Sequence, residues 1–207
     1  TTLIPNDEES VLSGFAITSE GYFFAKRRNG VESKVYYLKE PGAAPEELAL
    51  PFTAGSASLS TKGVDHKELW IGMGGWTRDG ARYRYDPKDK SFTYEMLSSK
   101  AEFPEFENIV AEEIMIPSHD GVMVPVSLIY NKNMKRDGKN PLMLYGYGSY
   151  GITISPFFST IFLTWISEGG VIAIGHVRGG GELGDAWHKA GYKKTKSNTW
   201  KDFIACA

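Results

Sequence analysis

The chain has 207 residues, of which 42% are hydrophobic, and its 23 basic and 25 acidic side chains leave a formal net charge of −2. Such a balance excludes a global electrostatic field that would recruit nucleic acid or an anionic membrane surface. The single cysteine, Cys206, excludes an intrachain disulfide framework and a zinc site built from paired thiolates.

The start of the sequence carries no targeting signal. The residues TTLIPNDEES lack an initiator Met, a basic region and an apolar core, and no apolar run reaches the ~20 residues that a membrane-spanning helix needs. The last residues, NTWKDFIACA, have an Asn198 cap and helical apolar spacing and then end. We therefore expect an interior segment of a longer protein, for which cytoplasmic and periplasmic locations both stay open and the oligomeric state is unknown.

The first hundred residues alternate short strand-like segments with turn signals such as RNG, PGAAP and DPKDK. Close spacing of this kind favours antiparallel meanders. The segments predicted as strands are 15–18, 22–26, 34–38, 47–52, 56–60, 68–73, 81–86 and 91–97.

One half of this region resembles the other at an offset of roughly 45 residues, which is the size of a propeller blade. The run YFF at 22–24 matches LWI at 69–71. Two blades cannot close a ring, so a propeller would need further blades upstream. A fragment of a β-sandwich stays open as an alternative, because short strands at this spacing serve both architectures.

After Pro104 the pattern changes to that of a mixed sheet. Alternating residues in 112–117 and 122–130 predict a hairpin with Asp120-Gly121 at its tip. The change from an all-β pattern marks a domain boundary, and we expect two domains. Their predicted ranges are 1–106 and 107–207.

The second domain continues in a strand, helix, strand order, which implies a right-handed parallel crossover. Two further helices are predicted near the end. The predicted segments are an apolar strand at 141–148, a helix at 157–170, an apolar strand at 171–177, and helices at 182–191 and 198–207.

A serine hydrolase on an α/β sheet needs a nucleophile on a sharp GxSxG turn, and this sequence has no such motif. Ser149, in YGYGSYG, follows the bulky Tyr147 by two residues, so we expect a loop residue rather than a nucleophile. The glycines of this loop leave the tyrosine rings accessible, and a phenol held by its strand can donate a hydrogen bond to a developing oxyanion. The alternative is ordinary packing of aromatic residues, with glycines at turns.

The run 179–184 has the GxGxxG spacing of a dinucleotide site, with Asp202 further on. Arg178 and Glu182 crowd that turn, so the alternative is a structural loop fixed by a charge pair between them. None of the four histidines has a partner at metal-ligand spacing. This favours surface or hydrogen-bonded structural roles for His66, His119, His176 and His188.

Together, the motifs of residues 112–207 resemble the opening of the hydrolase domain of the prolyl oligopeptidase family. They are SHDGVMVPVSLIY, PLMLYGYGSYG, HVRGGGELGDAWHKAG and NTWKDFIACA. The preceding strands resemble, less specifically, the last blades of that family's seven-bladed propeller. The resemblance implies a mixed fold class: C-terminal blades of a β-propeller followed by the N-terminal part of an α/β-hydrolase domain. Within the family, YGYGSYG and HVRGGGELG look most like oligopeptidase B.

The resemblance implies that Tyr147 donates its hydroxyl to the oxyanion hole and that Tyr150 lines the primary specificity pocket. It implies a serine peptidase of short peptides that needs no metal or organic cofactor and cleaves after Lys or Arg, as oligopeptidase B does, or after Pro. The family's serine, aspartate and histidine should follow residue 207, so we expect the chain alone to be inactive. The run 179–184 becomes a structural loop near the active site. The alternatives are a noncatalytic propeller-derived binding module and a dinucleotide-binding α/β protein.

Overall fold

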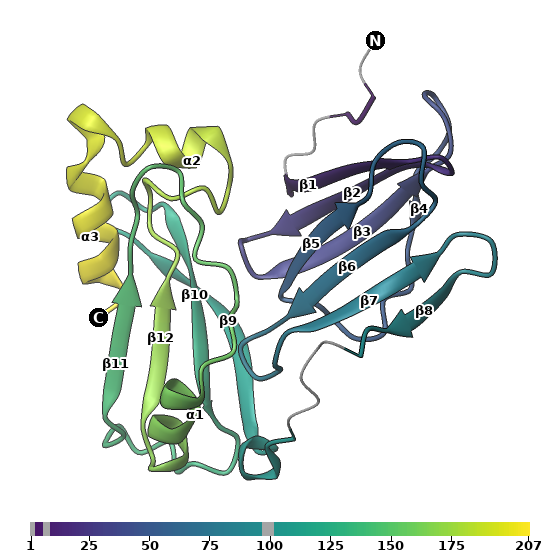
Figure 1. The fold of residues 1–207 in the computed structure, drawn as a ribbon. Coiled ribbons are helices and arrows are strands. Elements are labelled where there is room, and N and C mark those ends of the chain that lie inside the picture. The colour runs from purple at the N-terminus through teal and green to yellow at the C-terminus, as the bar shows by residue number, and fades with distance from the viewer. Residues whose placement is uncertain (1–2, 6–8, 97–101) are drawn as a thin grey trace.

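The computed structural model describes residues 3–5, 9–96 and 102–207. In these ranges the strands form three four-stranded sheets, two in the first half of the chain and one in the second (Figure 1). None of the described helices is long and apolar enough to cross a membrane. Residues 1–2 and 6–8 of the opening segment, and Leu97 at the end of a predicted strand, lie outside the described residues.

Each sheet of the first half is an antiparallel meander in chain order. Because β1 begins at residue 11 and β5 at residue 56, the sheets repeat after 45 residues, as the sequence predicts, and they are successive propeller-like blades. The first blade consists of β1 (Val11–Thr18), β2 (Gly21–Arg28), β3 (Glu32–Leu38) and β4 (Glu46–Glu47). The second consists of β5 (Ser56–Thr61), β6 (Leu69–Gly74), β7 (Ala81–Asp86) and β8 (Ser91–Tyr94).

The last strand of the first blade is shorter than the predicted segment 47–52. Only Glu46 and Glu47 pair with β3, and the Leu48 N–H adds one hydrogen bond to Val35 O at 2.8 Å. The ladder between β3 and β4 ends at this point, and Pro51 has no N–H to donate to it.

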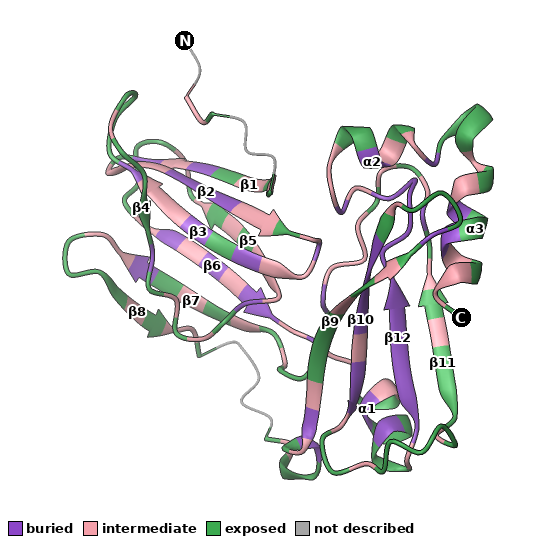
Figure 2. Ribbon diagram, turned by 180° about the vertical axis from the view of Figure 1, so that it is seen from behind, coloured by how far each residue is buried: buried purple, intermediate pink, exposed green. Residues whose placement is uncertain are grey.

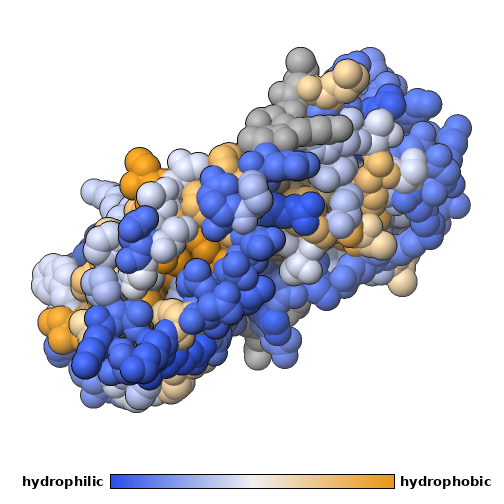
Figure 3. All heavy atoms as spheres, turned by 90° about the horizontal axis from the view of Figure 1, so that it is seen from below, coloured by the Kyte–Doolittle hydropathy of each residue, from blue (hydrophilic) through white to orange (hydrophobic). Residues whose placement is uncertain are grey.

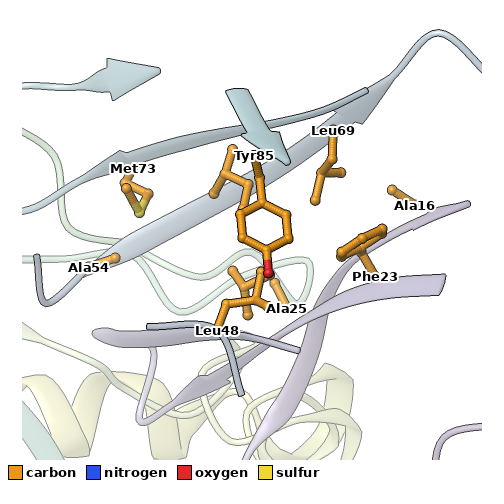
Figure 4. Packing of buried hydrophobic residues seen from close by; sticks show 10 residues of the cluster. Ala16, Phe23, Ala25, Leu48, Ala54, Leu69, Met73 and Tyr85 are labelled. Atoms are coloured by element: carbon orange, nitrogen blue, oxygen red, sulfur yellow. The ribbon is translucent and has the colours of Figure 1, made fainter. Parts of the chain in front are cut away.

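The two blades share one hydrophobic core (Figure 4). The ring of Tyr85 from β7 meets the ring of Phe23 from β2 edge to face, with centroids 6.1 Å apart. Phe23 and Leu69 are completely buried, and full burial of such a side chain contributes about 1.5–3 kcal/mol of hydrophobic free energy. Side-chain burial therefore joins the blades, whereas backbone ladders hold each blade together.

The second half contains a mixed sheet in the order β11-β12-β10-β9. The hairpin of β9 and β10 is antiparallel and β11 runs parallel to β12, as the sequence predicts. Every residue of β12 is buried, whereas β9 and β11 are largely exposed (Figure 2). The strands are β9 (Ile109–Pro117), β10 (Met123–Asn131), β11 (Leu142–Gly146) and β12 (Val171–Gly175).

Helix α1 (Thr160–Ser167) connects β11 to β12 and is shorter than the predicted 157–170. The Ser159 side chain caps its first turn by accepting a hydrogen bond from the Phe162 N–H at 3.4 Å. Its buried residues Leu163 and Ile166 join the core of the sheet, to which the 3-10 turn η1 (Pro104–Phe106) adds its phenylalanine. The helix thus covers one face of the sheet.

The chain ends in α2 (Asp185–Lys189), the 3-10 turn η2 (Lys193–Thr195) and α3 (Ser197–Ala205). Helix α2 covers only part of the predicted 182–191, because Gly184 before it has φ +85°, a left-handed conformation that cannot belong to a right-handed helix. The predicted Asn198 cap is wrong. Turn η2 leads directly into α3, and the Asn198 side chain donates instead to a backbone carbonyl, that of Ala190, at 3.0 Å.

Exposed apolar side chains gather on the second half of the chain. Seen from below the view of Figure 1, the most hydrophobic atoms lie over the α/β half, and hydrophilic atoms prevail over the blades (Figure 3). Ile161 on α1 is 80% exposed and Leu142 on β11 is 52% exposed. The edge strand β11 and helix α1 therefore carry much of the apolar surface.

Candidate active site

Two loops follow the parallel strands β11 and β12 and lie side by side at their carboxyl ends (Figure 1). We call residues 146–151 the tyrosine loop and residues 178–184 the glycine loop. The Gly151 N–H donates to Gly179 O at 3.1 Å, so the two backbones are in direct contact. Open α/β sheets commonly bind their ligands at this edge, which makes the pair of loops the candidate site.

The contact between the loops requires glycine at positions 179 and 181. A Cβ on Gly179 would lie 2.2 Å from Gly148 O, and one on Gly181 would lie 2.2 Å from Gly151 O. Carbon and oxygen atoms cannot approach so closely, so these glycines permit backbone packing. The carbonyl oxygens that fill this side of the glycine loop would also repel a pyrophosphate, which a dinucleotide site must attract.

The segment that enters α3 holds both loops from the other side. Lys196 Nζ donates to Gly148 O at 2.5 Å and to Ser149 Oγ at 2.7 Å, and burial lowers the pKa of this lysine. Thr199 Oγ1 donates to Arg178 O, on the glycine loop, at 2.6 Å. The two loops are therefore tied to the same short segment.

This frame presents two tyrosine rings to solvent. Tyr147 is 45% exposed and Tyr150 is 84% exposed, so both rings are accessible, as the glycines of the loop predict. Tyr150 has φ +57°, a left-handed conformation that costs a non-glycine residue about 1–3 kcal/mol. Residues held in such a conformation cluster at functional sites, where the surrounding structure fixes the direction of the side chain.

Neither of the nucleophilic side chains near the site is activated by its surroundings. Ser149 lies in a loop, and the ammonium of Lys196 donates to its hydroxyl and to a carbonyl, so the lysine is placed as a donor rather than as an unprotonated base. Burial, together with the charge of Asp202, raises the pKa of the Cys206 thiol to about 11, which keeps it protonated at neutral pH.

A charge cluster underlies the glycine loop, in which Arg178 and Asp202 are buried and Asp120 is exposed. The Arg178 guanidinium donates to Asp202 at 2.6 and 2.8 Å and to Asp120 at 2.6 Å, and Asp202 also accepts from the Ser118 hydroxyl at 2.6 Å. The two carboxylates raise the pKa of Arg178. The predicted pair of Arg178 with Glu182 is therefore wrong, because two aspartates, from the β9–β10 turn and from α3, bind the guanidinium.

The same cluster makes the stability of the chain depend on acid pH. Hydrogen bonds from Arg178 lower the pKa of Asp120 from 3.8 to about 2. Below pH 3.8 the unfolded chain therefore binds a proton that the folded chain does not, and the stabilisation is lost as the pH falls from about 4 to about 2. We expect the urea concentration at the unfolding midpoint to fall as the pH is lowered from about 4 to about 2, and to fall less steeply in Asp120→Asn than in the parent chain. If the midpoint depends equally steeply on pH in the two proteins, Asp120 is not the source of this pH dependence.

Glu182 lies instead beside a buried histidine. Its Oε1 accepts the Ile154 N–H at 3.0 Å and lies 3.8 Å from His176 Nδ1. His176 Nε2 is 2.9 Å from Ser127 Oγ. His188 Nδ1 is 2.9 Å from the Gly179 carbonyl oxygen in the glycine loop. Both histidines are therefore hydrogen-bonded, as the sequence predicts. Within 3–5, 9–96 and 102–207, no group of three or more His, Cys, Asp or Glu side chains could hold a metal ion.

Sequence reasoning missed the residues that hold the loops in place. Lys196 belongs to the run KKTK, which has the composition of a solvated surface turn, so no local signal marks it. In the sequence, Asp120 marks only the tip of a hairpin, and Asp202 only follows a run with the spacing of a dinucleotide motif. The available signal was Arg178, because an arginine directly after a buried strand needs carboxylate partners.

Comparisons with known proteins match this chain to one family of peptidases. The profile of the prolyl oligopeptidase family matches residues 156–207. Prolyl oligopeptidase A of Galerina marginata is 33% identical over 98% of this chain, which spans 28% of that relative. The structure of prolyl oligopeptidase B of the same organism, bound to a 35mer hydrolysis and macrocyclization substrate, matches 98% of this chain and 29% of its own at 29% identity with a TM-score of 0.87.

Oligopeptidase B of Trypanosoma brucei is also similar, with 32% identity, a TM-score of 0.81, and coverage of 99% of this chain and 30% of its own. Prolyl oligopeptidases and an oligopeptidase B, the two kinds of enzyme that the sequence motifs resemble, are thus both among the matches. The chain spans less than a third of the length of each of these three proteins.

Proposed function

Because the chain belongs to the prolyl oligopeptidase family, we propose that it forms part of a serine peptidase that hydrolyses short peptides. In this proposal residues 1–106 contribute blades to a propeller, and residues 107–207 open the hydrolase domain. The serine, aspartate and histidine of the catalytic triad lie on polypeptide that follows residue 207. The 207-residue chain alone is then inactive.

The observation that carries the proposal is the exposed pair of phenol rings on a loop that is held from two sides. In the proposed mechanism the Tyr147 hydroxyl, together with a backbone N–H, donates a hydrogen bond to the oxyanion that forms when the serine attacks the peptide carbonyl. A donor fixed in advance needs no reorganisation during the reaction. The contacts of Lys196 and Gly179 with the tyrosine loop provide that fixation.

Tyr150 is proposed to contact the side chain that precedes the scissile bond. In the longer polypeptide, Tyr150→Ala should weaken discrimination between substrates with Pro, Lys or Arg at that position by about tenfold, because one face of the pocket is lost. The measurement is kcat/KM on matched short peptides, which also decides between proline and basic specificity. Tyr192→Ala, at an exposed tyrosine outside the two loops, is the control. An unchanged preference in Tyr150→Ala would remove this residue from the pocket.

A fluorophosphonate probe, which reacts with activated serines, tests the proposal as a whole. The 207-residue chain should remain unlabelled, and a longer gene product should be labelled at one serine beyond residue 207. Labelling of the short chain at Ser149 would mean that Lys196 acts as a base, and the proposed mechanism would be wrong. A longer product that is neither labelled nor able to cleave peptides would favour a noncatalytic binding module.

A further inference from the structure

The first blade contacts the second half of the chain next to the candidate site, through the end of β2 and through the turn between β2 and β3. Arg27, near the end of β2, donates to Ser155 Oγ at 2.6 Å and to Thr153 Oγ1 at 3.1 Å. These acceptors are 128 and 126 residues away in the sequence and lie just after the tyrosine loop. The contact therefore joins a propeller-like blade to the segment that follows the tyrosine loop.

Glu182 of the glycine loop holds the same segment from the other side. Its carboxylate accepts the N–H of Ile154, between the two residues that Arg27 binds. A Cβ on Gly30, in the β2–β3 turn, would lie 2.8 Å from Glu182 Cγ and 3.1 Å from Thr153 Cγ2. The blade turn, the segment and the glutamate are thus packed against one another without space for a methyl group.

The region where the blade turn meets residues 153–155 and Glu182 also contains buried polar atoms without a hydrogen-bond partner among the described residues. Four buried side-chain nitrogen or oxygen atoms of the described residues have no hydrogen-bond partner in the protein, and three of them belong to this region: Arg27 Nε, His176 Nδ1 and Glu182 Oε2. The fourth is Trp76 Nε1. His176 and Glu182 are 0% and 2% exposed. Buried polar groups are rarely left unpaired, so each of these atoms calls for a specific explanation.

We propose that Arg27 and Glu182 form a latch between the first blade and the α/β half, which clamps residues 153–155 and thereby positions the tyrosine loop. Only Gly151 and Ile152 separate the clamped segment from Tyr150. Both are themselves bonded, Gly151 to Gly179 O and Ile152 to Ser149 O. A displacement of the blade would therefore move the backbone of the tyrosine loop, because the two residues in between are held by these hydrogen bonds. The consequence for catalysis rests on the proposed function, but the latch itself does not.

Hydrogen exchange measured by mass spectrometry on the 207-residue chain tests the latch. In Arg27→Ala, amides within residues 149–155 should exchange at least about tenfold faster than in the parent, while amides of β2 and β3 keep their rates. Arg28→Ala is the matched control, because the neighbouring Arg28 pairs with Glu32 on the exposed surface of the same blade. It should leave residues 149–155 unchanged. Thr153→Val, which removes one acceptor, should reproduce part of the effect, and Arg27→Lys should restore part of the protection.

Unchanged exchange in residues 149–155 of both Arg27→Ala and Thr153→Val would overturn the latch. A uniform rise across the blades would overturn it as well, because Arg27 would then only stabilise its own sheet. Neither result depends on catalysis. If the longer polypeptide has no peptidase activity but the local effect is present, the latch stands and the proposed function falls.

Discussion

Replacing Tyr147 by Phe in the longer polypeptide is expected to lower kcat by about ten- to a thousandfold and to leave peptide affinity nearly unchanged. The substitution removes only the hydroxyl that is proposed to bind the developing oxyanion. An interaction made in the transition state alone affects turnover and not the binding of the ground state. Steady-state kinetics on a short fluorogenic peptide, with separate kcat and KM, is the measurement.

Tyr145→Phe is the matched control for this experiment. Tyr145 is also 45% exposed and stands on β11, two residues before Tyr147. It lies one step before the tyrosine loop, so its hydroxyl has no proposed contact with the oxyanion. The kcat and the kcat/KM of Tyr145→Phe should stay within about twofold of the parent values, the range expected when no transition-state contact is lost. If Tyr147→Phe behaves like Tyr145→Phe, Tyr147 has no part in the oxyanion hole.

Arg178→Leu should lower the free energy of unfolding by about 3–5 kcal/mol. The reason is that the carboxyl group of Asp202, which is fully buried, would lose the cation that compensates it. A leucine fills part of the volume of the arginine, so the loss comes mainly from the uncompensated charge rather than from a cavity. Urea unfolding followed by circular dichroism and tryptophan fluorescence would measure the change.

Lys189→Ala provides the comparison on the neighbouring helix α2. Lys189 pairs with Asp185 at 2.6 Å, but both side chains are about 70% exposed, at 69% and 73%. Exposed pairs of this kind contribute less than about 1 kcal/mol. Similar losses in the two variants would mean that the charge cluster of Arg178 is not energetically different from a surface ion pair.

Much of the fold follows from local patterns in the sequence. The short strands of the blades, the hairpin at Asp120-Gly121 and the strand, helix, strand order are all present, because each depends on residues that are neighbours in the chain. The errors concern boundaries. Strand β4 ends before Leu48, whose side chain packs in the core that both blades share, and η2 leads directly into α3 without an Asn198 cap. At both positions the local sequence pattern does not contain the contacts that decide the boundary.

The supports of the candidate site could not be predicted in this way. Charge and spacing suggested that Arg178 pairs with Glu182, four residues away, but its partners are 58 and 24 residues away in Asp120 and Asp202. Lys196 reaches a carbonyl in the tyrosine loop 48 residues earlier. Pairs so distant leave no periodic signal in a single sequence. Tyr147 and Tyr150 could be singled out, because glycines next to aromatic residues are a local feature.

The long reach of Lys196 also has a consequence for the order of events during synthesis. The strands of each blade can pair as soon as they leave the ribosome, because each pairs only with its neighbours in the chain, although the core that the two blades share needs both. The tyrosine loop has to wait for a residue 48 positions later, which at 5–20 residues per second is a delay of about 2–10 s. During that interval its aromatic side chains lack their final frame. A chaperone that binds aromatic segments of nascent chains could therefore bind this loop before Lys196 fixes it.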